Sequence, residues 1–435
     1  MSTSRFGLLL LLLSGLSLAA CEPPPEVPAD LILVGGEVWT GVPEAEMAQA
    51  VAIKGGFIQA VGTDREVRAL AGPETEVMEL RGRMVLPGFI DAHTHFIPGG
   101  FQLSSVDLRN AATPEEFARR IGEFARSRPP GTWITGGDWD HEMWGGELPR
   151  REWIDEVTPE HPVLVSRLDG HMALANSLAL EMAEVSGATR VPAGGEMVLD
   201  RASGRPTGIL KDEAMGLVSQ VIPPSSEEEL DRALDAAIEH ALSLGVTQTH
   251  HMGSWTDLVT FRRARADGRL RMRVYASVPI STWERMRDFI AENGRGDDRL
   301  WWGGMKGFVD GSLGSTTAWF YDAYADDPST NGLLTTDTAS LRRWIVEADG
   351  AELHPIVHSI GDQANDWILD VFAEAIEANG PRDRRFRIEH AQHLSPDAFD
   401  RIRELEVVAS MQPYHAIDDG RWAEKRIGPE RIKTT

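Results

Sequence analysis

The sequence predicts an α/β protein built on a TIM-like (β/α) barrel, with an N-terminal β-sandwich domain and a large insertion after the first barrel strand. Short apolar runs separated by Gly-Gly pairs occupy residues 31–87, a pattern typical of short strands joined by turns. From residue 88 onward, strand-like runs alternate with amphipathic helical segments. This order builds a parallel sheet, and eight such units close a barrel.

The composition narrows the functional classes. The chain has 435 residues, 42% hydrophobic and 25% charged, which is typical of a globular protein. With 43 Lys and Arg against 67 Asp and Glu, the formal net charge is −24. This argues against nucleic acid as a partner, because binding to phosphates depends on Lys and Arg. A single cysteine rules out an internal disulfide and a thiolate cluster, so a metal ion would bind histidine, carboxylate or a modified lysine.

Residues 1–20 are predicted to be a signal peptide, because Arg5 precedes an apolar run that ends in small residues. The run is shorter than the roughly 20 residues that a membrane span needs. Leu18-Ala19-Ala20-Cys21 resembles a bacterial lipobox, which predicts lipidation of Cys21; an ordinary secretory leader is the alternative. A Pro-rich linker follows at 21–30. We expect an exported protein, lipid-anchored to a bacterial membrane on its periplasmic or outer-membrane face.

The first folded domain is expected at 31–87, as a small sandwich of antiparallel strands. Gly35-Gly36 and Gly55-Gly56 are typical of tight turns between such strands. The expected strands are 31–34, 50–53, 57–62, 76–80 and 84–86.

The barrel is expected at 88–435. Ser226 and Glu229 form a capping-box pattern before an apolar stripe of helical period, and Gly245 ends that helix. Further helices are expected near 256–267, 282–293, 341–349, 363–379 and 396–405, the last capped by Ser395. Seven strands are expected, at 88–92, 246–250, 272–278, 305–309, 355–359, 386–390 and 407–411, and an eighth is not in this sequence.

The insertion at about 97–225 is rich in Trp, Gly and Pro. Strand-like runs at 133–136 and 162–167 indicate an inserted subdomain, since a structureless stretch of this length is implausible. Such a subdomain would cover one barrel face and wall a substrate pocket. Trp139, with Asp140 and His141, is alternatively part of a lid, but core packing is the commoner role of clustered tryptophans such as those of this insertion. They are Trp133, Trp139, Trp144 and Trp153.

The strongest functional signal is His93-Thr94-His95, which ends the first expected barrel strand. Residues two apart on a strand point to the same side, so both imidazoles face one way. Neutral imidazole is the commonest metal ligand, and a converging pair suits Zn, Fe, Ni or Mn. Because barrel enzymes hold their sites at the carboxyl ends of the strands, this pair predicts a metal site.

Two more histidines occupy equivalent places, and a lysine lies on a further strand. His358 and His390 each end a strand-like run, and Lys306 lies on another expected strand. Taken singly, each histidine is equally well explained as structural, and Lys306 as a residue at a frayed strand start. Together with His93 and His95 they indicate one ion-binding centre, because a buried cation is costly unless it is paired or modified.

These segments resemble the metal-dependent amidohydrolase superfamily, and within it the amidohydrolase family 3, or YtcJ-like, group. The resemblance runs from about residue 31 to residue 435. It implies that His93 and His95 hold one metal ion, that His358 and His390 hold a second, and that Lys306, carboxylated by carbon dioxide, bridges them. It also implies that the cofactor is a divalent metal, with zinc the first expectation, present as one or two ions. The segments that carry the resemblance are 87–95, 169–171, 176–177, Lys306 with 310–315, 358–362 and 387–392.

The resemblance also implies the reaction, which is hydrolysis of an amide-type, non-peptide C–N bond by metal-activated water. Relatives use a general base, an Asp at the end of the eighth strand in a Gly-Ser-Asp context. No such segment precedes Thr435, so we expect a C-terminally truncated copy with poor stability and little activity, and an active longer version. The alternative is a truncated, non-catalytic solute-binding lipoprotein with the same fold, and metal content would distinguish the two.

Further substrate-pocket residues are expected at His171, His251 and Asp310. His171 comes from the insertion, His251 adjoins a second histidine that would face the other way, and Asp310 either orients Lys306 or shapes its turn. The expected substrate is a small molecule, and formation of a homodimer is left open. The sequence contains no Walker loop, dinucleotide fingerprint, zincin motif or Gly-x-Ser-x-Gly motif.

Overall fold

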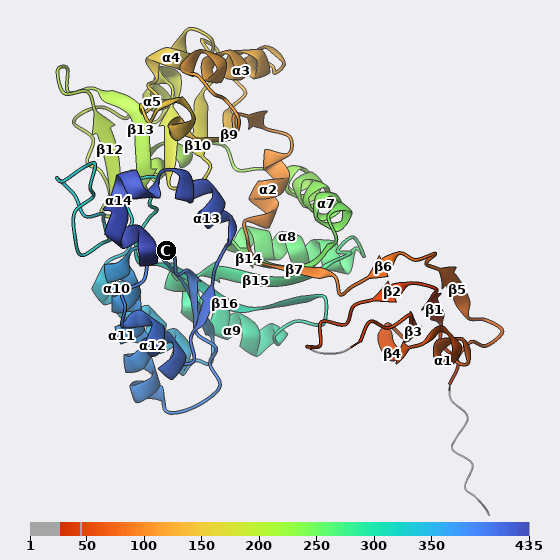
Figure 1. The fold of residues 1–435 in the computed structure, drawn as a ribbon. Helices are drawn as coiled ribbons and strands as arrows, with labels where there is room; N and C mark the ends of the chain where they lie inside the picture. Colours follow the sequence, from red (N-terminus) through yellow and green to blue (C-terminus); the bar gives the residue numbers. More distant parts are fainter. Residues whose placement is uncertain (1–26, 44–45, 435) are drawn as a thin grey trace, which may run out of the picture. The chain divides into compact units, whose positions relative to one another are not determined.

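The computed structural model describes residues 27–43 and 46–434 (Figure 1). The expected signal peptide, Cys21 and most of the linker lie outside the described residues. The chain divides into two compact units, one that ends at Pro87 and one that begins at Gly88. None of the helices in the described ranges has the length and apolar character that crossing a membrane requires.

The first unit contains a four-stranded and a two-stranded sheet. Its elements are β1 (Leu31–Val34), β2 (Glu37–Val38), β3 (Ala50–Lys54), β4 (Phe57–Gly62), α1 (Asp64–Arg68), β5 (Glu76–Glu79) and β6 (Met84–Val85). β3 runs antiparallel to β1 and β4, as expected. The expectation is wrong for β5, which runs parallel to β1, and for β6, which runs parallel to β2. Helix α1, begun by a capping box of Thr63 and Glu66, makes the crossover that a parallel return of the chain requires.

The second unit is built around a sheet of seven parallel strands, which confirms the predicted fold class. Their order is that of the chain from β7 to β19, so these two strands are the ends of the sheet. The strands are β7 (Phe89–Thr94), β14 (Val246–Met252), β15 (Arg273–Pro279), β16 (Leu300–Phe308), β17 (His354–Ser359), β18 (Arg387–His390) and β19 (Val408–Ser410).

Helices connect these strands and cover the outer face of the sheet (Figure 1). Ser226 and Glu229 form the predicted capping box, and Leu234 and Ile238 of the following helix are fully buried against the sheet. The predicted cap at Ser395 is wrong, because Asp397 stands at the cap position and the Ser395 hydroxyl donates to Asp366 at 2.7 Å. The helices are α2 (Phe96–Gln102), α7 (Glu227–Ser243), α8 (Trp255–Ala266), α9 (Trp283–Asn293), α10 (Thr338–Gly350), α11 (Asp362–Asn379) and α12 (Ala398–Glu404).

The insertion after β7 forms its own six-stranded sheet with short helices. Trp139, Trp144 and Trp153 pack with Phe117 in one buried cluster, whereas Trp133 packs in another. These tryptophans therefore form core and not a lid. The main elements are β8 (Val106–Asp107), α3 (Pro114–Arg126), β9 (Ile134–Trp139), η1 (His141–Trp144), α4 (Glu152–Asp155), β10 (Val163–Arg167), β11 (Met172–Ala175), α5 (Ser177–Met182), β12 (Gly195–Leu199), β13 (Pro206–Asp212), η2 (Glu213–Met215) and α6 (Gly216–Ser219).

The segment after β19 consists of α13 (Tyr414–Asp418), η4 (Asp419–Arg421), α14 (Ala423–Arg431) and η5 (Ile432–Thr434). It lies beside the insertion (Figure 1). Glu142 of η1 forms ion pairs with Lys425 at 3.2 Å and Arg426 at 3.3 Å. The insertion and this segment therefore meet through charged side chains.

Candidate active site

Five histidines form a continuous row where the barrel strands end. Four of them are the histidines predicted as metal ligands, and the fifth is His171, which lies just before β11 of the insertion. Neighbouring ring centres are 5.6 Å apart for His95 and His93, 4.7 Å for His93 and His390, 4.6 Å for His390 and His358, and 4.9 Å for His358 and His171. The structure therefore gathers residues that are up to 297 positions apart in the chain.

Two positions in the row depart from regular strand geometry. β7 ends at Thr94, and His95 stands at the N-cap of α2 with φ −100°. On a regular strand Glu389 and His390 would face opposite sides, but His390 has φ +74° and Ala391 has φ +44°. Positive φ is uncommon for residues other than glycine, and such strained backbone tends to cluster at functional sites. Here it brings both Glu389 and His390 next to His93.

Four histidines of the row are anchored through one ring nitrogen each. The anchoring acceptor is a carboxylate, a side-chain amide or a backbone carbonyl, and the second ring nitrogen makes no hydrogen bond within the described residues. This is the arrangement of metal-binding histidines, in which the anchored nitrogen fixes the orientation of the free one. The anchors are Glu389 for Nδ1 of His93 at 2.5 Å, Gln412 for Nδ1 of His390 at 2.6 Å, Asp212 for Nδ1 of His171 at 2.6 Å, and the Gly311 carbonyl for Nε2 of His358 at 2.9 Å.

The electrostatics favour neutral imidazoles in most of the row. Burial lowers the pKa of His93, and it lowers the pKa of His358 and of His390 well below the usual value. Neutral imidazole is the form that binds metal ions. His171 differs, because burial would lower its pKa but the hydrogen bond and charge of Asp212 outweigh burial and raise it.

Lys306 lies on β16 and is 5% exposed. Its Nζ atom has no hydrogen-bond partner within the described residues and lies 4.8 Å from the ring centre of Phe308. Burial lowers the pKa of this amine to about 8. A buried cation without a partner is costly, so the surroundings of Lys306 disfavour its charged form.

The imidazoles and the amine are chemically suited to a divalent metal. In the described part of the chain, however, no three His, Cys, Asp or Glu side chains lie close enough together to hold an ion as they stand. With Zn–N bonds of about 2.1 Å, two imidazoles on one tetrahedral ion have ring centres about 5 Å apart. The separations in the row, 4.6 to 5.6 Å, match that value. The free ring nitrogens and the unpartnered Lys306 amine are the groups that such a centre would use.

Two charged residues of the site, Arg387 and Glu389, were not singled out from the sequence. The Arg387 guanidinium donates to Glu389 at 2.6 Å, to the Ala92 carbonyl of β7 at 2.6 Å and to Ser410 of β19 at 2.9 Å, and it contacts His250 Nδ1 at 2.6 Å. It therefore joins both ends of the sheet. Their spacing in the sequence was the feature that could have identified them. Charged residues two positions apart on a core strand face the same side, and buried charges need partners there.

Asp310 is fully buried beside His358, 3.6 Å from its Nε2 atom. Its carboxylate accepts the backbone N–H groups of Ile360, Gly361 and Trp319 at 2.8 to 3.0 Å. Burial raises its pKa to about 7 against the effect of these bonds. Asp310 therefore fastens the loop that follows His358, and no hydrogen bond joins it to Lys306.

The structure does not bring His251 to the row. Its Nδ1 atom accepts the Phe96 N–H at 3.0 Å, and its Nε2 atom lies 3.2 Å from Asp257 of α8. The adjacent His250 is the one that contacts Arg387 inside the barrel. Alternation along the strand sends the two neighbours to opposite sides.

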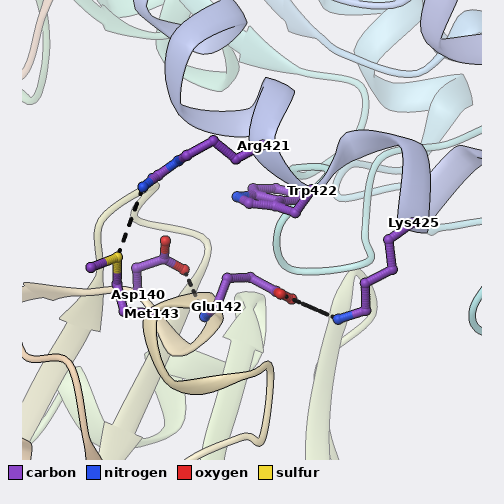
Figure 2. A pocket seen from close by; sticks show the side chains of 6 residues that line it. All are labelled: Asp140, Glu142, Met143, Arg421, Trp422 and Lys425. Atoms are coloured by element: carbon purple, nitrogen blue, oxygen red, sulfur yellow. Dashed lines mark hydrogen bonds and ion pairs between the residues drawn. The ribbon is translucent and has the colours of Figure 1, made fainter.

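A pocket of about 320 Å³ opens between the insertion and the segment after β19. Figure 2 shows Trp422 between Arg421 and Lys425 on one side, facing Asp140, Glu142 and Met143 on the other. Asp140 accepts a hydrogen bond from buried Arg167 at 3.0 Å, and Arg167 also donates to Asp169 at 2.7 Å. The Asp169 carboxylate in turn accepts the backbone N–H of His171, so a chain of bonds links the pocket to the row.

Comparison with known proteins settles the family. The family model described as "Amidohydrolase family" matches residues 76–435. The chain belongs to the amidohydrolase family. The histidine row and Lys306 thus lie in a protein of a hydrolase family.

Curated relatives agree with this assignment. The chain is 40% identical to Protein LONG AFTER FAR-RED 3 of Arabidopsis thaliana, over 95% of this chain and 73% of the relative. It is 32% identical to the putative amidohydrolase YtcJ of Bacillus subtilis, over 92% and 76%. It is 31% identical to the N-substituted formamide deformylase of Arthrobacter pascens, over 83% and 69%.

A solved structure shares the fold. An uncharacterized metal-dependent hydrolase from Pyrococcus furiosus matches with a TM-score of 0.71 and 29% identity. The match covers 93% of this chain and 81% of that one. The barrel and its insertion are therefore an arrangement that this amidohydrolase shares with a known structure.

Proposed function

We propose that this amidohydrolase uses a divalent metal centre to hydrolyse an amide-type C–N bond other than a peptide bond in a small molecule. The observation that carries the proposal is the row of anchored imidazoles beside the unpartnered amine of Lys306. The names of two relatives, a putative amidohydrolase and an N-substituted formamide deformylase, support this reaction class. They make N-substituted formamides the first compounds to test.

In this proposal His93 and His95 would hold one ion, and His358 and His390 would hold a second. Lys306, carboxylated by carbon dioxide, would bridge the two, and zinc is the first metal to test. A bound divalent metal lowers the pKa of water towards about 7 and polarises a carbonyl group. Carboxylation would convert the buried amine into an anionic oxygen ligand, which accounts for its lack of a hydrogen-bond partner.

The chain's own side chains prepare this centre. Glu389 accepts the Nδ1 proton of His93 and thereby leaves Nε2 unprotonated and free. Gln412 accepts from Nδ1 of His390 and likewise leaves its Nε2 free, whereas the Gly311 carbonyl accepts from Nε2 of His358 and leaves its Nδ1 free. Asp310 fixes the backbone after His358. The substrate would lie beside the row, with the pocket at Trp422 available for the part remote from the scissile bond.

The first test measures metal and hydrolysis separately on the full chain. We expect purified protein, incubated with zinc and bicarbonate and then desalted, to retain close to stoichiometric zinc, and the variant His358→Asn to retain less. Formate release from N-butylformamide would support the formamide class. Protein that retains no zinc would refute the metal centre, whereas retained zinc without formate release would refute only this substrate class.

We also propose that the protein is exported and anchored through a lipid on Cys21. The supporting observation is the lipobox-like segment 18–21 after an apolar run. Expression in a bacterial host with radiolabelled palmitate should label the wild-type chain and leave Cys21→Ser unlabelled. Equal labelling of both, or of neither, would contradict the anchor.

A further inference from the structure

His171 reaches the row from the insertion, and its position is fixed by the barrel as well. Asp169 and His171 belong to the turn between β10 and β11, and the Asp169 Oδ1 atom accepts the His171 N–H at 3.1 Å. The other carboxylate oxygen of Asp169 accepts the hydroxyl of Ser312 at 2.5 Å and the Arg167 guanidinium at 2.7 Å. Because Ser312 follows barrel strand β16, the turn that carries His171 is tied to the barrel.

The partner of His171 has features of a functional residue. Asp212 accepts the His171 Nδ1–H at 2.6 Å and has φ +45° with ψ −124°, a sparsely populated conformation for a residue other than glycine. Its second oxygen is buried and has no hydrogen-bond partner within the described residues. Such strain persists only where the surroundings impose it, and it clusters at ligand sites. Within the described residues, the Asp212 side chain makes its hydrogen bond to His171, and this bond orients the imidazole.

The spacing of His171 matches that of the other histidines. Its ring centre lies 4.9 Å from that of His358, compared with 4.6 Å between His358 and His390. Its Nε2 atom makes no hydrogen bond within the described part of the chain, whereas Nδ1 is held by a carboxylate. The pair of Asp212 and His171, at one end of the row, thus repeats the pair of Glu389 and His93 further along it.

We propose that His171 is a metal ligand, and that it completes with His358 and His390 a three-imidazole site for the second ion. This inference rests on the proposed metal centre and adds to it a ligand that comes from the insertion. Three histidines are a common ligand set for a catalytic divalent ion. Asp212 is then the positioning residue, because a carboxylate on the far nitrogen orients a ligating histidine and increases its basicity.

The test is a cobalt(II) titration of the full-length protein, followed by calorimetry and by the visible absorption of bound cobalt, in the absence of any substrate. We expect His171→Asn to weaken the binding of one ion by about 100-fold or more, and Asp212→Asn to weaken the same event by about 10-fold. Binding at the site of His93 and His95 should be unchanged. His161→Asn is the matched control, since His161 is a buried histidine of the same insertion that contacts the Thr132 carbonyl instead.

The outcomes separate this inference from the function on which it rests. Cobalt binding by wild type, with unchanged affinity in both His171→Asn and Asp212→Asn, would overturn the assignment of His171 and leave the metal centre standing. Absence of cobalt binding by wild type would overturn both. Cooperative urea unfolding of each metal-free variant shows that a lost ion reflects a lost ligand, and Asp212→Asn keeps the test decisive if His171→Asn fails to fold.

Discussion

Glu389 holds the Nδ1 atom of His93 at 2.5 Å and so joins β18 to β7, two strands that are not neighbours in the sheet. Both side chains are largely buried, with the Glu389 side chain fully shielded from solvent. The carboxylate lowers the freedom of the imidazole to rotate and selects the tautomer with an unprotonated Nε2 atom. Orientation by a carboxylate typically increases metal affinity by a factor of about 10 to 100.

The first prediction is that Glu389→Gln lowers metal affinity by about 10-fold to 100-fold, because the amide preserves shape but loses the negative charge. Competition between the protein and a chromophoric chelator for zinc measures the affinity. Glu347→Gln, on an exposed part of α10, is the control and should leave the affinity unchanged. Equal zinc affinity in wild type and Glu389→Gln would show that the contact with His93 has no role in metal binding.

The second prediction concerns Arg387 and stability. Arg387→Met removes the bonds to β7 and β19 and leaves Glu389 without its buried cation. Breaking one side of a buried ion pair costs about 3–5 kcal/mol, so we expect a loss of that order in the free energy of unfolding in urea. The double variant Arg387→Met, Glu389→Gln should recover part of it, because it removes the unpaired charge.

Arg385→Met is the matched control for Arg387, since Arg385 is exposed and, among the residues that the structure describes, forms an ion pair only with Asp383. Arg385→Met should change the free energy of unfolding by no more than about 0.5 kcal/mol. A similar loss in both single variants would mean that Arg387 contributes no more than a surface charge. A double variant less stable than Arg387→Met would contradict the unpaired-charge explanation.

The alternation of strands and helices was predictable because it depends on local patterns. The capping box at Ser226 and the seven strand runs are short-range signals, and the barrel follows from their order. The parallel direction of β5 was missed because it depends on the short crossover helix α1. In the insertion, β11, β12 and β13 were not among the expected strands, although β13 is seven residues long and buried throughout.

The histidine row was predictable in part, because the carboxyl ends of parallel strands meet at one edge of a barrel. His93 and Glu389 are 296 positions apart, and no local pattern couples them. Alternation required that only one of His250 and His251 face inward, but it did not say which one. The contact of His250 with Arg387 decides it. Asp212 carried no sequence signal, since its role depends on a strained backbone and on a turn from another strand.

The third prediction is that replacing Lys306 increases the stability of the metal-free protein and decreases its affinity for metal. Lys306→Met removes a buried amine that has no hydrogen-bond partner within the described residues and replaces it with an apolar side chain of similar length. We expect the metal-free protein to become more stable by about 1 kcal/mol or more, and zinc affinity to fall. Urea unfolding of the metal-free protein and chelator competition measure the two effects.

Lys211→Met is the control for Lys306. Lys211 is also buried, but it pairs with Glu196 at 3.0 Å, so its replacement should not stabilise the protein and should leave zinc affinity unchanged. If Lys306→Met destabilised the metal-free protein and left zinc bound as tightly as wild type does, Lys306 would be a structural lysine and the proposed bridge would be wrong.

The last prediction concerns pH and His141. Burial, together with the positive charge of Arg167, lowers the pKa of His141 to about 3 in the folded protein, whereas the unfolded chain has a value near 6.5. The unfolded state therefore binds more protons between these values, and stability falls as the pH decreases from about 6.5 towards 3, by about 1.4 kcal/mol per pH unit for one such group.

His141→Asn removes the titrating ring, and asparagine is still able to accept from Arg167, which lies 3.4 Å from the His141 Nδ1 atom. Urea unfolding at pH 7, 5.5 and 4.5 should show a shallower loss for His141→Asn than for wild type, while the exposed-site variant His240→Asn should follow wild type. Because every other titrating group is common to the proteins compared, parallel curves for wild type and His141→Asn would contradict the assignment of a buried neutral imidazole at this position.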